Sequence, residues 1–141
     1  MAPSLVLDTN VLIAALRSSR GASFQLLSRV GGEEFQLDLS VPLVLEYEEV
    51  AKRDARALGL SYGDIDDILD YLCAVGHHRR IHFLWRPVLR DSQDDMVLEL
   101  AVEAASDCIV THNVRDFEGA ARFGIRVLTP SAFLKRIGVT S

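Results

Sequence analysis

The chain has 141 residues, of which 49% are hydrophobic and 25% charged, a composition typical of one globular domain with its own core. Its net charge of −5 excludes the globally basic surface that many nucleic-acid-binding proteins carry, although it leaves room for a local basic patch. No hydrophobic run is long enough to span a membrane, there is no signal peptide, and both cysteines stand in apolar segments, so we expect one cytoplasmic domain over residues 1–141.

Short strands alternate with helices in the first half of the chain. In order, we predict a strand over residues 4–7, helices over 11–16 and 22–30, a strand over 35–39 and a helix from Pro42 to about Leu58. Pro42 fits the first turn of its helix, where a missing backbone N–H has no consequence. The Gly31-Gly32 pair ends the second helix.

The second half continues the alternation. It contains a helix opened by a capping box at 61–64, a basic stretch over 77–90 with a strand near 81–84, a helix over 94–105, a strand over 108–111, a short helix over 118–123, a strand over 125–128 and a last helix capped by Ser131. This order predicts a three-layer α/β/α domain with a central parallel sheet. Asp8 and Asn113 follow two of the strands, so we expect both to face the crevice at the carboxyl ends of the strands.

Four acidic residues stand where an apolar strand ends or where an apolar helix face begins: Asp8, Glu46, Asp94 and Asp116. A carboxylate at the end of a buried strand is unfavourable unless a positive charge compensates it. Four such residues, far apart in the sequence, suggest a shared metal ion.

Helical geometry separates Asp94 from its acidic neighbours. At about 100° per residue, Asp94 begins the apolar face of its helix, where the helix dipole also favours an anion. Asp95, Glu99 and Glu103 rotate toward solvent in the same projection. We therefore favour a functional role for Asp94, whereas surface charge at a helix N-terminus is enough to explain Asp95.

Spacing alone leaves other acids open. Glu46 and Glu48 both lie at the edges of the apolar face of their helix, and periodicity does not choose between them. Asp116 follows a predicted strand near the crevice, but it also fits the cap of the next short helix. Asp107 precedes that strand, so we expect it in a turn or cap at the opposite edge of the sheet.

Four segments contain the candidate acids: LVLDTNVL from Leu5, SVPLVLE from Ser40, RDSQDD from Arg90 with LELA from Leu98, and IVTHNVRDF from Ile109. In this order they resemble the motifs of PIN domains, especially those of the VapC-like ribonuclease toxins of type II toxin–antitoxin pairs. The match extends from Leu5 to Pro130.

The resemblance favours Glu46 over Glu48 and supports Asp116. Two positions depart from the pattern. Ser92 is commonly proline in the relatives, and the last motif often reads Thr-Gly-Asp where this chain has Thr111-His112-Asn113. The VapC-like branch instead has asparagine there, with an aspartate three residues later.

The resemblance implies an endoribonuclease that hydrolyses RNA phosphodiester bonds with Mg²⁺ or Mn²⁺, and it implies a cognate antitoxin and a homodimer as partners. The expected metal ligands and catalytic residues are Asp8, Glu46, Asp94 and Asp116. The residues expected to orient water, ligands or phosphate are Thr9, Asn10, Thr111 and Asn113. Strand-end capping is an alternative role for Thr9.

Two groups of basic residues are candidates for contacts with RNA phosphates. One contains Arg17, Arg20, Lys52, Arg53 and Arg56, and the other is the acid-free segment 77–82, with Arg79 and Arg80, followed by Arg86 and Arg90. A solvated loop is the simpler explanation of the second group. The spacing of His77, His78 and His82 fits neither a helical pair nor a zinc finger, so we do not expect zinc.

Other functions fit parts of the pattern. A PIN fold that binds RNA without cleaving it would keep the same architecture, and a metal-dependent phosphatase or receiver domain would also place an aspartate after a strand. The phosphatase pattern needs a second aspartate where Asn10 stands, and we find no early acidic pair and lysine for a receiver. A flap nuclease would need additional helices.

Overall fold

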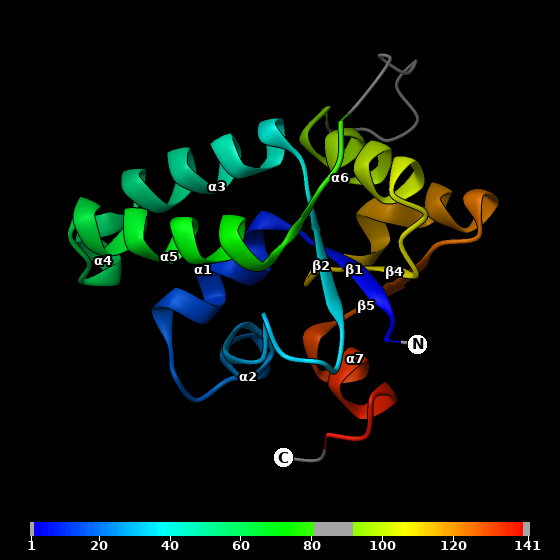
Figure 1. The fold of residues 1–141 in the computed structure, drawn as a ribbon, viewed down its shortest axis with the longest axis horizontal. Helices are drawn as coiled ribbons and strands as arrows, with labels where there is room; N and C mark the ends of the chain where they lie inside the picture. Colours follow the sequence, from blue (N-terminus) through cyan, green and yellow to red (C-terminus); the bar gives the residue numbers. More distant parts are fainter. Residues whose placement is uncertain (1, 81–91, 140–141) are drawn as a thin grey trace.

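Five parallel strands form the central sheet of the computed structural model, which describes residues 2–80 and 92–139 (Figure 1). In pairing order they are β3 (His77–His78), β2 (Gln36–Leu39), β1 (Ser4–Leu7), β4 (Cys108–Val110) and β5 (Arg126–Leu128). The central strands β1 and β4 are almost fully buried, because apolar side chains occupy both of their faces. The strand order reverses between these two strands, which is where a sheet of this kind binds its ligands.

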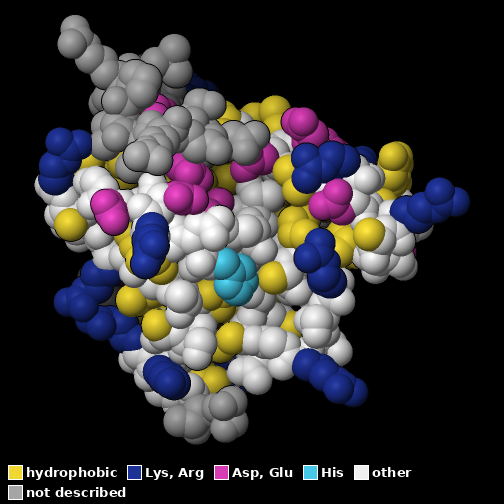
Figure 2. All heavy atoms as spheres, turned by 180° about the vertical axis from the view of Figure 1, so that it is seen from behind, with side chains coloured by type: hydrophobic (Ala, Val, Ile, Leu, Met, Phe, Trp, Pro, Cys, Tyr) yellow, Lys and Arg dark blue, Asp and Glu magenta, His cyan; other side chains and the backbone are white. Residues whose placement is uncertain are grey.

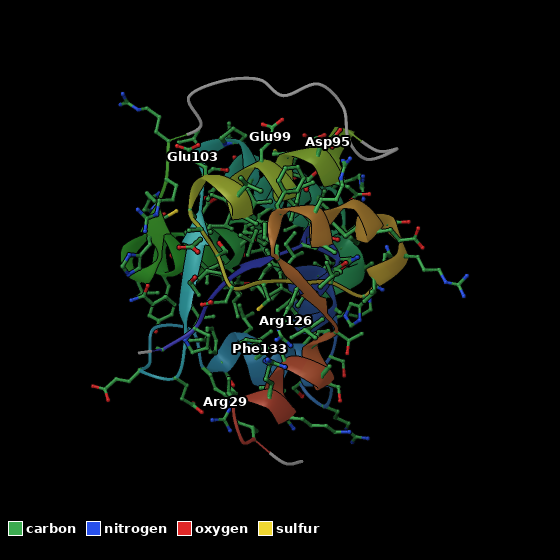
Figure 3. All side chains as sticks on the ribbon, turned by 90° about the vertical axis from the view of Figure 1, so that its right-hand side faces the viewer. Arg29, Asp95, Glu99, Glu103, Arg126 and Phe133 are labelled. Atoms are coloured by element: carbon green, nitrogen blue, oxygen red, sulfur yellow. The ribbon has the colours of Figure 1, made fainter. Side chains whose placement is uncertain are left out.

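Helices cover both faces of the sheet. They are α1 (Thr9–Arg17), α2 (Ala22–Ser28), α3 (Val41–Arg53), α4 (Ala55–Leu58), α5 (Tyr62–Val75), α6 (Ser92–Glu103), the 3-10 segment η1 (Val114–Phe123) and α7 (Pro130–Arg136). Helix α6 packs on β1, β2 and β4 with η1 beside it, while α2 and α7 pack together on the other side (Figures 1 and 3). This arrangement confirms the predicted three-layer fold. No described helix is both long and apolar enough to cross a bilayer.

Two predicted helix boundaries are wrong for a local reason. The helix expected over 42–58 is divided at Asp54, where the backbone leaves the helical conformation and α4 begins. The last helix is capped by Thr129 and not by Ser131, because Pro130 occupies its first turn and the capping hydroxyl must precede it. The edge strand beside β2 is His77–His78. The strand expected near 81–84 falls outside the described residues.

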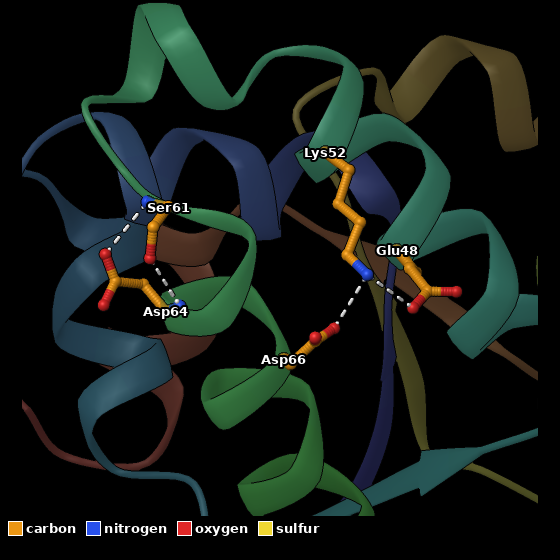
Figure 4. Close-up of polar contacts among 5 residues, drawn as sticks. All are labelled: Glu48, Lys52, Ser61, Asp64 and Asp66. Atoms are coloured by element: carbon orange, nitrogen blue, oxygen red, sulfur yellow. Dashed lines mark hydrogen bonds and ion pairs between the residues drawn. The ribbon is translucent and has the colours of Figure 1, made fainter.

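A capping box opens α5, and an ion pair links α5 to α3 (Figure 4). The Ser61 hydroxyl accepts from the Asp64 N–H at 3.0 Å, and the Asp64 carboxylate accepts from the Ser61 N–H at 2.9 Å, which confirms the capping box. The Lys52 ammonium lies 2.8 Å from Asp66 of α5 and 3.0 Å from Glu48 of α3, and these two bonds raise the pKa of Lys52. Glu48 therefore takes part in a surface ion pair.

One acid lies inside the sheet. Asp38 in β2 is 1% exposed, and its Oδ2 accepts a hydrogen bond from the Ser106 hydroxyl at 2.6 Å. Burial raises the pKa of Asp38 above its ordinary value of 3.8, although the Ser106 bond and the charges of Arg79 and His77 act in the opposite direction. The ionised carboxylate is therefore less favourable in the folded protein than in the unfolded chain.

The free energy of unfolding of Asp38→Asn, measured relative to that of the natural protein, should increase as the pH rises above 3.8. The folded state binds the Asp38 proton more tightly than the unfolded state, so the free energy of unfolding of the natural protein falls across the interval between the two pKa values. Asparagine removes this titration and keeps an acceptor for Ser106. Urea unfolding over a series of pH values measures the difference. The same change at the exposed Asp67 is the matched control, and a pH-independent difference for Asp38→Asn would contradict the prediction.

Candidate active site

The four acids singled out in the sequence line one cleft at the carboxyl edge of the sheet. The cleft has a volume of about 520 Å³, and its lining includes Asp8, Glu46, Asp94 and Asp116. These residues come from the end of β1, from α3, from the first turn of α6 and from η1, respectively. Figure 2 shows acidic side chains gathered on one face of the molecule, with a histidine and several basic side chains on the same face. Segments far apart in the sequence meet here because β1 and β4 are neighbours.

Asp8 is buried and accepts hydrogen bonds on both of its carboxylate oxygens. It is 8% exposed, it is the N-cap of α1, and its Oδ1 accepts from the Thr9 N–H at 2.8 Å. Its Oδ2 accepts from the Thr111 hydroxyl at 2.8 Å and from the Asn10 amide at 3.2 Å. These donors and the positive end of the helix dipole compensate a carboxylate that would otherwise be unfavourable at a buried position.

The same side chains also hold the loop that follows β4. The Thr111 hydroxyl accepts from the Asn113 N–H at 3.0 Å, and the side-chain oxygen Oδ1 of Asn10 accepts from the His112 N–H at 3.2 Å. Asn113 thus enters the network through its backbone, while its exposed side chain lines the cleft. Three of the four residues expected to orient ligands have side chains bonded to the acids, and the fourth lies beside them.

The structure distinguishes the two candidate glutamates of α3. Glu46 lines the cleft, and its Oε2 accepts a hydrogen bond from the Thr9 hydroxyl. Glu48 turns instead to Lys52, as described above. Thr9 therefore links Glu46 to the end of β1, which is more than the strand-end cap that we considered for it.

Tyr47 supports the cleft from below, a role that the sequence pattern did not reveal. Its side chain is fully buried, and its hydroxyl donates to the backbone carbonyl of Leu7 at 2.5 Å. Burial, together with the negative charges of Asp8 and Glu46, raises the pKa of Tyr47 well above its ordinary value of 10.0. The phenol therefore stays protonated at neutral pH and remains a donor to the last residue of β1.

The prediction for Asp95 is wrong. Asp95 is buried, with 7% of its surface exposed, whereas Asp94 is partly exposed in the cleft. Figure 3 shows Asp95, Glu99 and Glu103 following one another along α6, and of these only Glu103 is exposed. The helical projection assumed one buried face, but α6 packs against α3 and η1 as well as against the sheet, so its buried surface is wider.

The donor set of the cleft fits a hard divalent cation, since carboxylate oxygens are the ligands that Mg²⁺ and Mn²⁺ prefer. Across 2–80 and 92–139, no three acidic, histidine or cysteine side chains are already close enough to ligate one ion together. Mg²⁺ usually keeps several waters and takes only one or two protein carboxylates. The acids at the edges of the cleft are therefore suited to binding through water.

Two of the predicted basic residues stand beside the acids. Arg17 and Arg53 line the cleft, and the Arg53 Nε lies 3.2 Å from Asp54 Oδ1. Arg20 lines a separate small hollow against α7. Among the described residues, the arginines that line the cleft therefore come from the C-terminal ends of α1 and α3.

The second basic group lies elsewhere or is not described. Arg79 and Arg80 are exposed and directly follow β3, at the far edge of the sheet from β5, and they do not line the cleft as the described residues form it. The remainder of that group, including His82, Arg86 and Arg90, falls within residues 81–91 and so outside the described residues.

His112 is a further residue of the cleft wall that the sequence did not single out as functional. Its ring Nε2 lies 2.8 Å from the Ser23 hydroxyl, and the exposed side chain borders the acids. The available signal was its position between Thr111 and Asn113, both of which were expected to orient ligands.

A larger hollow, of about 880 Å³, lies at the opposite edge of the sheet, away from the acids. Asp107, Arg126 and Phe133 are among its lining residues, and Figure 3 shows the last two far from Asp95. Asp107 accepts from the Ser4 N–H at 2.8 Å, which confirms its predicted structural role at this edge.

Comparisons with known proteins place the fold. A family model described as PIN domain matches residues 4–115, a range that ends one residue before Asp116. Among solved structures, a chain of the crystal structure of VapBC2 from Rickettsia felis, bound to a DNA fragment from their promoter, is similar with a TM-score of 0.59 and 11% identity. The similarity covers 88% of this chain and 98% of that chain, and at this identity it shows the fold alone. No curated protein matches the chain.

Thr111→Val should destabilise the protein by about 1.5–3 kcal/mol, because it removes a hydrogen bond to a buried charged group without changing the volume of the side chain. Thr111→Ser is the matched control, since it keeps the hydroxyl that bonds Asp8. Denaturant unfolding of the three proteins measures the effect. A serine variant as unstable as the valine variant would show that the methyl group, and not the hydrogen bond, matters here.

Proposed function

Since this chain belongs to the PIN domain family, whose domains are generally nucleases, we propose that it is a metal-dependent endoribonuclease and the toxin of a toxin–antitoxin pair. The observation that carries the proposal is the convergence of four acids, from four separate segments, on the cleft where β1 and β4 end. A set of oxygen donors at this place in the fold is suited to holding a cation against a phosphate.

The charge of the cleft explains why a cation is needed. Among the described residues, six acidic side chains and two arginines line it, so an RNA phosphate entering alone would meet net repulsion from this part of the wall. Mg²⁺ or Mn²⁺ held by the four acids would activate a water, orient the scissile phosphate and neutralise the charge that develops during displacement. In the hydrolysis, the water oxygen forms a bond to phosphorus, the bond from phosphorus to one ribose oxygen breaks, and that oxygen takes a proton.

The four acids differ in their burial and hydrogen bonds, and so would differ in how they bind the ion. Asp8 is fixed by three donors and Glu46 by the Thr9 hydroxyl, so these two would define the position of the ion. Asp94 is half-buried, as Glu46 is, and Asp116 is exposed, and these two would bind the ion directly or through its waters. The exposed side chain of Asn113 is placed to orient a water or a phosphate oxygen.

The proposed cellular role is that of a toxin with a cognate antitoxin. The similar solved structure is that of a VapBC2 complex, and this supports a cognate antitoxin as partner of this chain. We also propose RNA as the substrate and a homodimer as the assembly, both of which follow from the resemblance to VapC-like toxins.

Asp8→Asn should abolish metal-dependent RNA cleavage and leave the fold intact. Asparagine keeps an acceptor oxygen and is itself a good N-cap, so α1 retains its first turn, but the negative charge that holds the ion is lost. The measurement is cleavage of RNA in Mg²⁺ or Mn²⁺, with the cut sites mapped and the fold checked by thermal melting.

Glu49→Gln is the matched control for this variant. Glu49 also lines the cleft, but it is exposed and is not one of the four proposed ligands, so its loss should leave the cleavage rate nearly unchanged. Cleavage by Asp8→Asn at the natural rate would refute the proposed site. A natural protein that binds RNA but does not cut it with either metal would instead favour a binding module.

A further inference from the structure

We propose that the His112 ring and the apolar hollow beside it form a subsite that stacks one base of the RNA strand whose phosphate occupies the acidic cleft. The inference rests on the proposed function for its ligand, and it adds the part of the substrate that the site recognises. The protein would then recognise an unpaired nucleotide next to the cleavage position.

The subsite is a hollow beside the acidic cleft, and the two share lining residues. It has a volume of about 350 Å³, and apolar atoms form most of its wall, with contributions from Ala22 and Pro130. Ala14, Arg17 and His112 line both this hollow and the acidic cleft, so the two share one boundary. A strand with a phosphate at the acids would therefore carry a neighbouring base to an apolar surface.

The His112 ring is held in place before any ligand binds. The buried Ser23 hydroxyl lies 2.8 Å from its Nε2, and its backbone N–H donates to Asn10 at 3.2 Å. Asn10 in turn donates to Asp8, so the position of the ring is tied to the acid at the centre of the cleft. An exposed aromatic ring that is already fixed loses little side-chain entropy when a base stacks on it.

The side chains on the shared boundary match a nucleobase. Single-stranded RNA is recognised mainly by stacking of its bases on aromatic rings, including histidine, and on arginine guanidinium planes. Arg17 is exposed and forms no ion pair with any other described residue, so its guanidinium is available to a base or to the adjacent phosphate. A ring, a guanidinium and an apolar wall beside a metal-binding cleft favour a nucleotide over a purely apolar ligand.

Measuring the affinities of two RNA-like strands for two variants of His112 separates base stacking from the other ways in which His112 could contribute to binding. The two strands are a fluorescein-labelled uridine decanucleotide and a strand of the same length that keeps the sugars and phosphates but lacks the bases. The two variants are His112→Leu and His112→Phe, each combined with Asp8→Asn so that the strands stay intact. Both variants lose the bond to Ser23, and they differ in whether an aromatic ring remains.

We expect His112→Leu to weaken binding of the uridine strand by roughly 5-fold to 150-fold, the range measured for one stacked base. Its affinity for the strand without bases should not change, and His112→Phe should keep most of the affinity for the uridine strand. Equal losses for both strands, no loss for either, or no binding of either strand would each overturn the subsite. An unchanged affinity for the uridine strand would also leave the hollow open to another occupant, such as an apolar peptide.

The two proposals fail in different ways. The natural protein could cleave RNA while His112→Leu has no base-dependent effect on binding. That result would refute the subsite and support the nuclease proposal. A base-dependent effect together with no cleavage in Mg²⁺ or Mn²⁺ would refute the nuclease and leave the subsite. Thermal melting of each variant shows that the compared proteins are folded.

Discussion

The hydrogen bond from the Thr111 hydroxyl to the Asp8 carboxylate joins the ends of the two central strands, and the rest of the site depends on it. β1 and β4 pair along their length, but the backbone pairing ends where each strand leads into the next element. Beyond that point, side chains take over, with Asn10 and Thr111 holding both turns to one carboxylate. A buried acid thus organises the loops that form the walls of the cleft.

Around this fixed centre, the four acids differ in how far they are buried. Asp8 is buried, Glu46 and Asp94 are half-buried, and Asp116 is exposed, while Tyr47 anchors the strand end beneath Asp8. Such a gradient suits a site that must keep one ion in place and still admit a bulky phosphate with its own waters. The His112 ring belongs to the fixed part, because Asn10 binds its backbone.

The sequence was most informative where one strong signal decided the local structure. The buried runs that end at Asp8 and Thr111 predicted the parallel sheet and its functional edge, and the capping box at Ser61 predicted the start of α5. Helical periodicity was less informative where a helix packs on several sides. It placed Asp95 toward solvent, although α6 packs against α3 and η1 as well as against the sheet and Asp95 is buried. It left Glu46 and Glu48 open, and only the resemblance favoured Glu46; in the structure Glu48 pairs with Lys52, which also binds Asp66 of α5.

Paramagnetic broadening by Mn²⁺ tests most directly whether the four acids of the cleft hold a divalent ion. In a ¹H–¹⁵N spectrum of the natural protein, substoichiometric Mn²⁺ should first broaden the amide signals of Thr9, His112 and Asn113, next to the cleft. The signal of Arg126, at the hollow on the opposite edge, should persist, and Asp8→Asn should abolish the selective effect. Broadening spread evenly over both edges, or selective broadening that survives Asp8→Asn, would contradict the account.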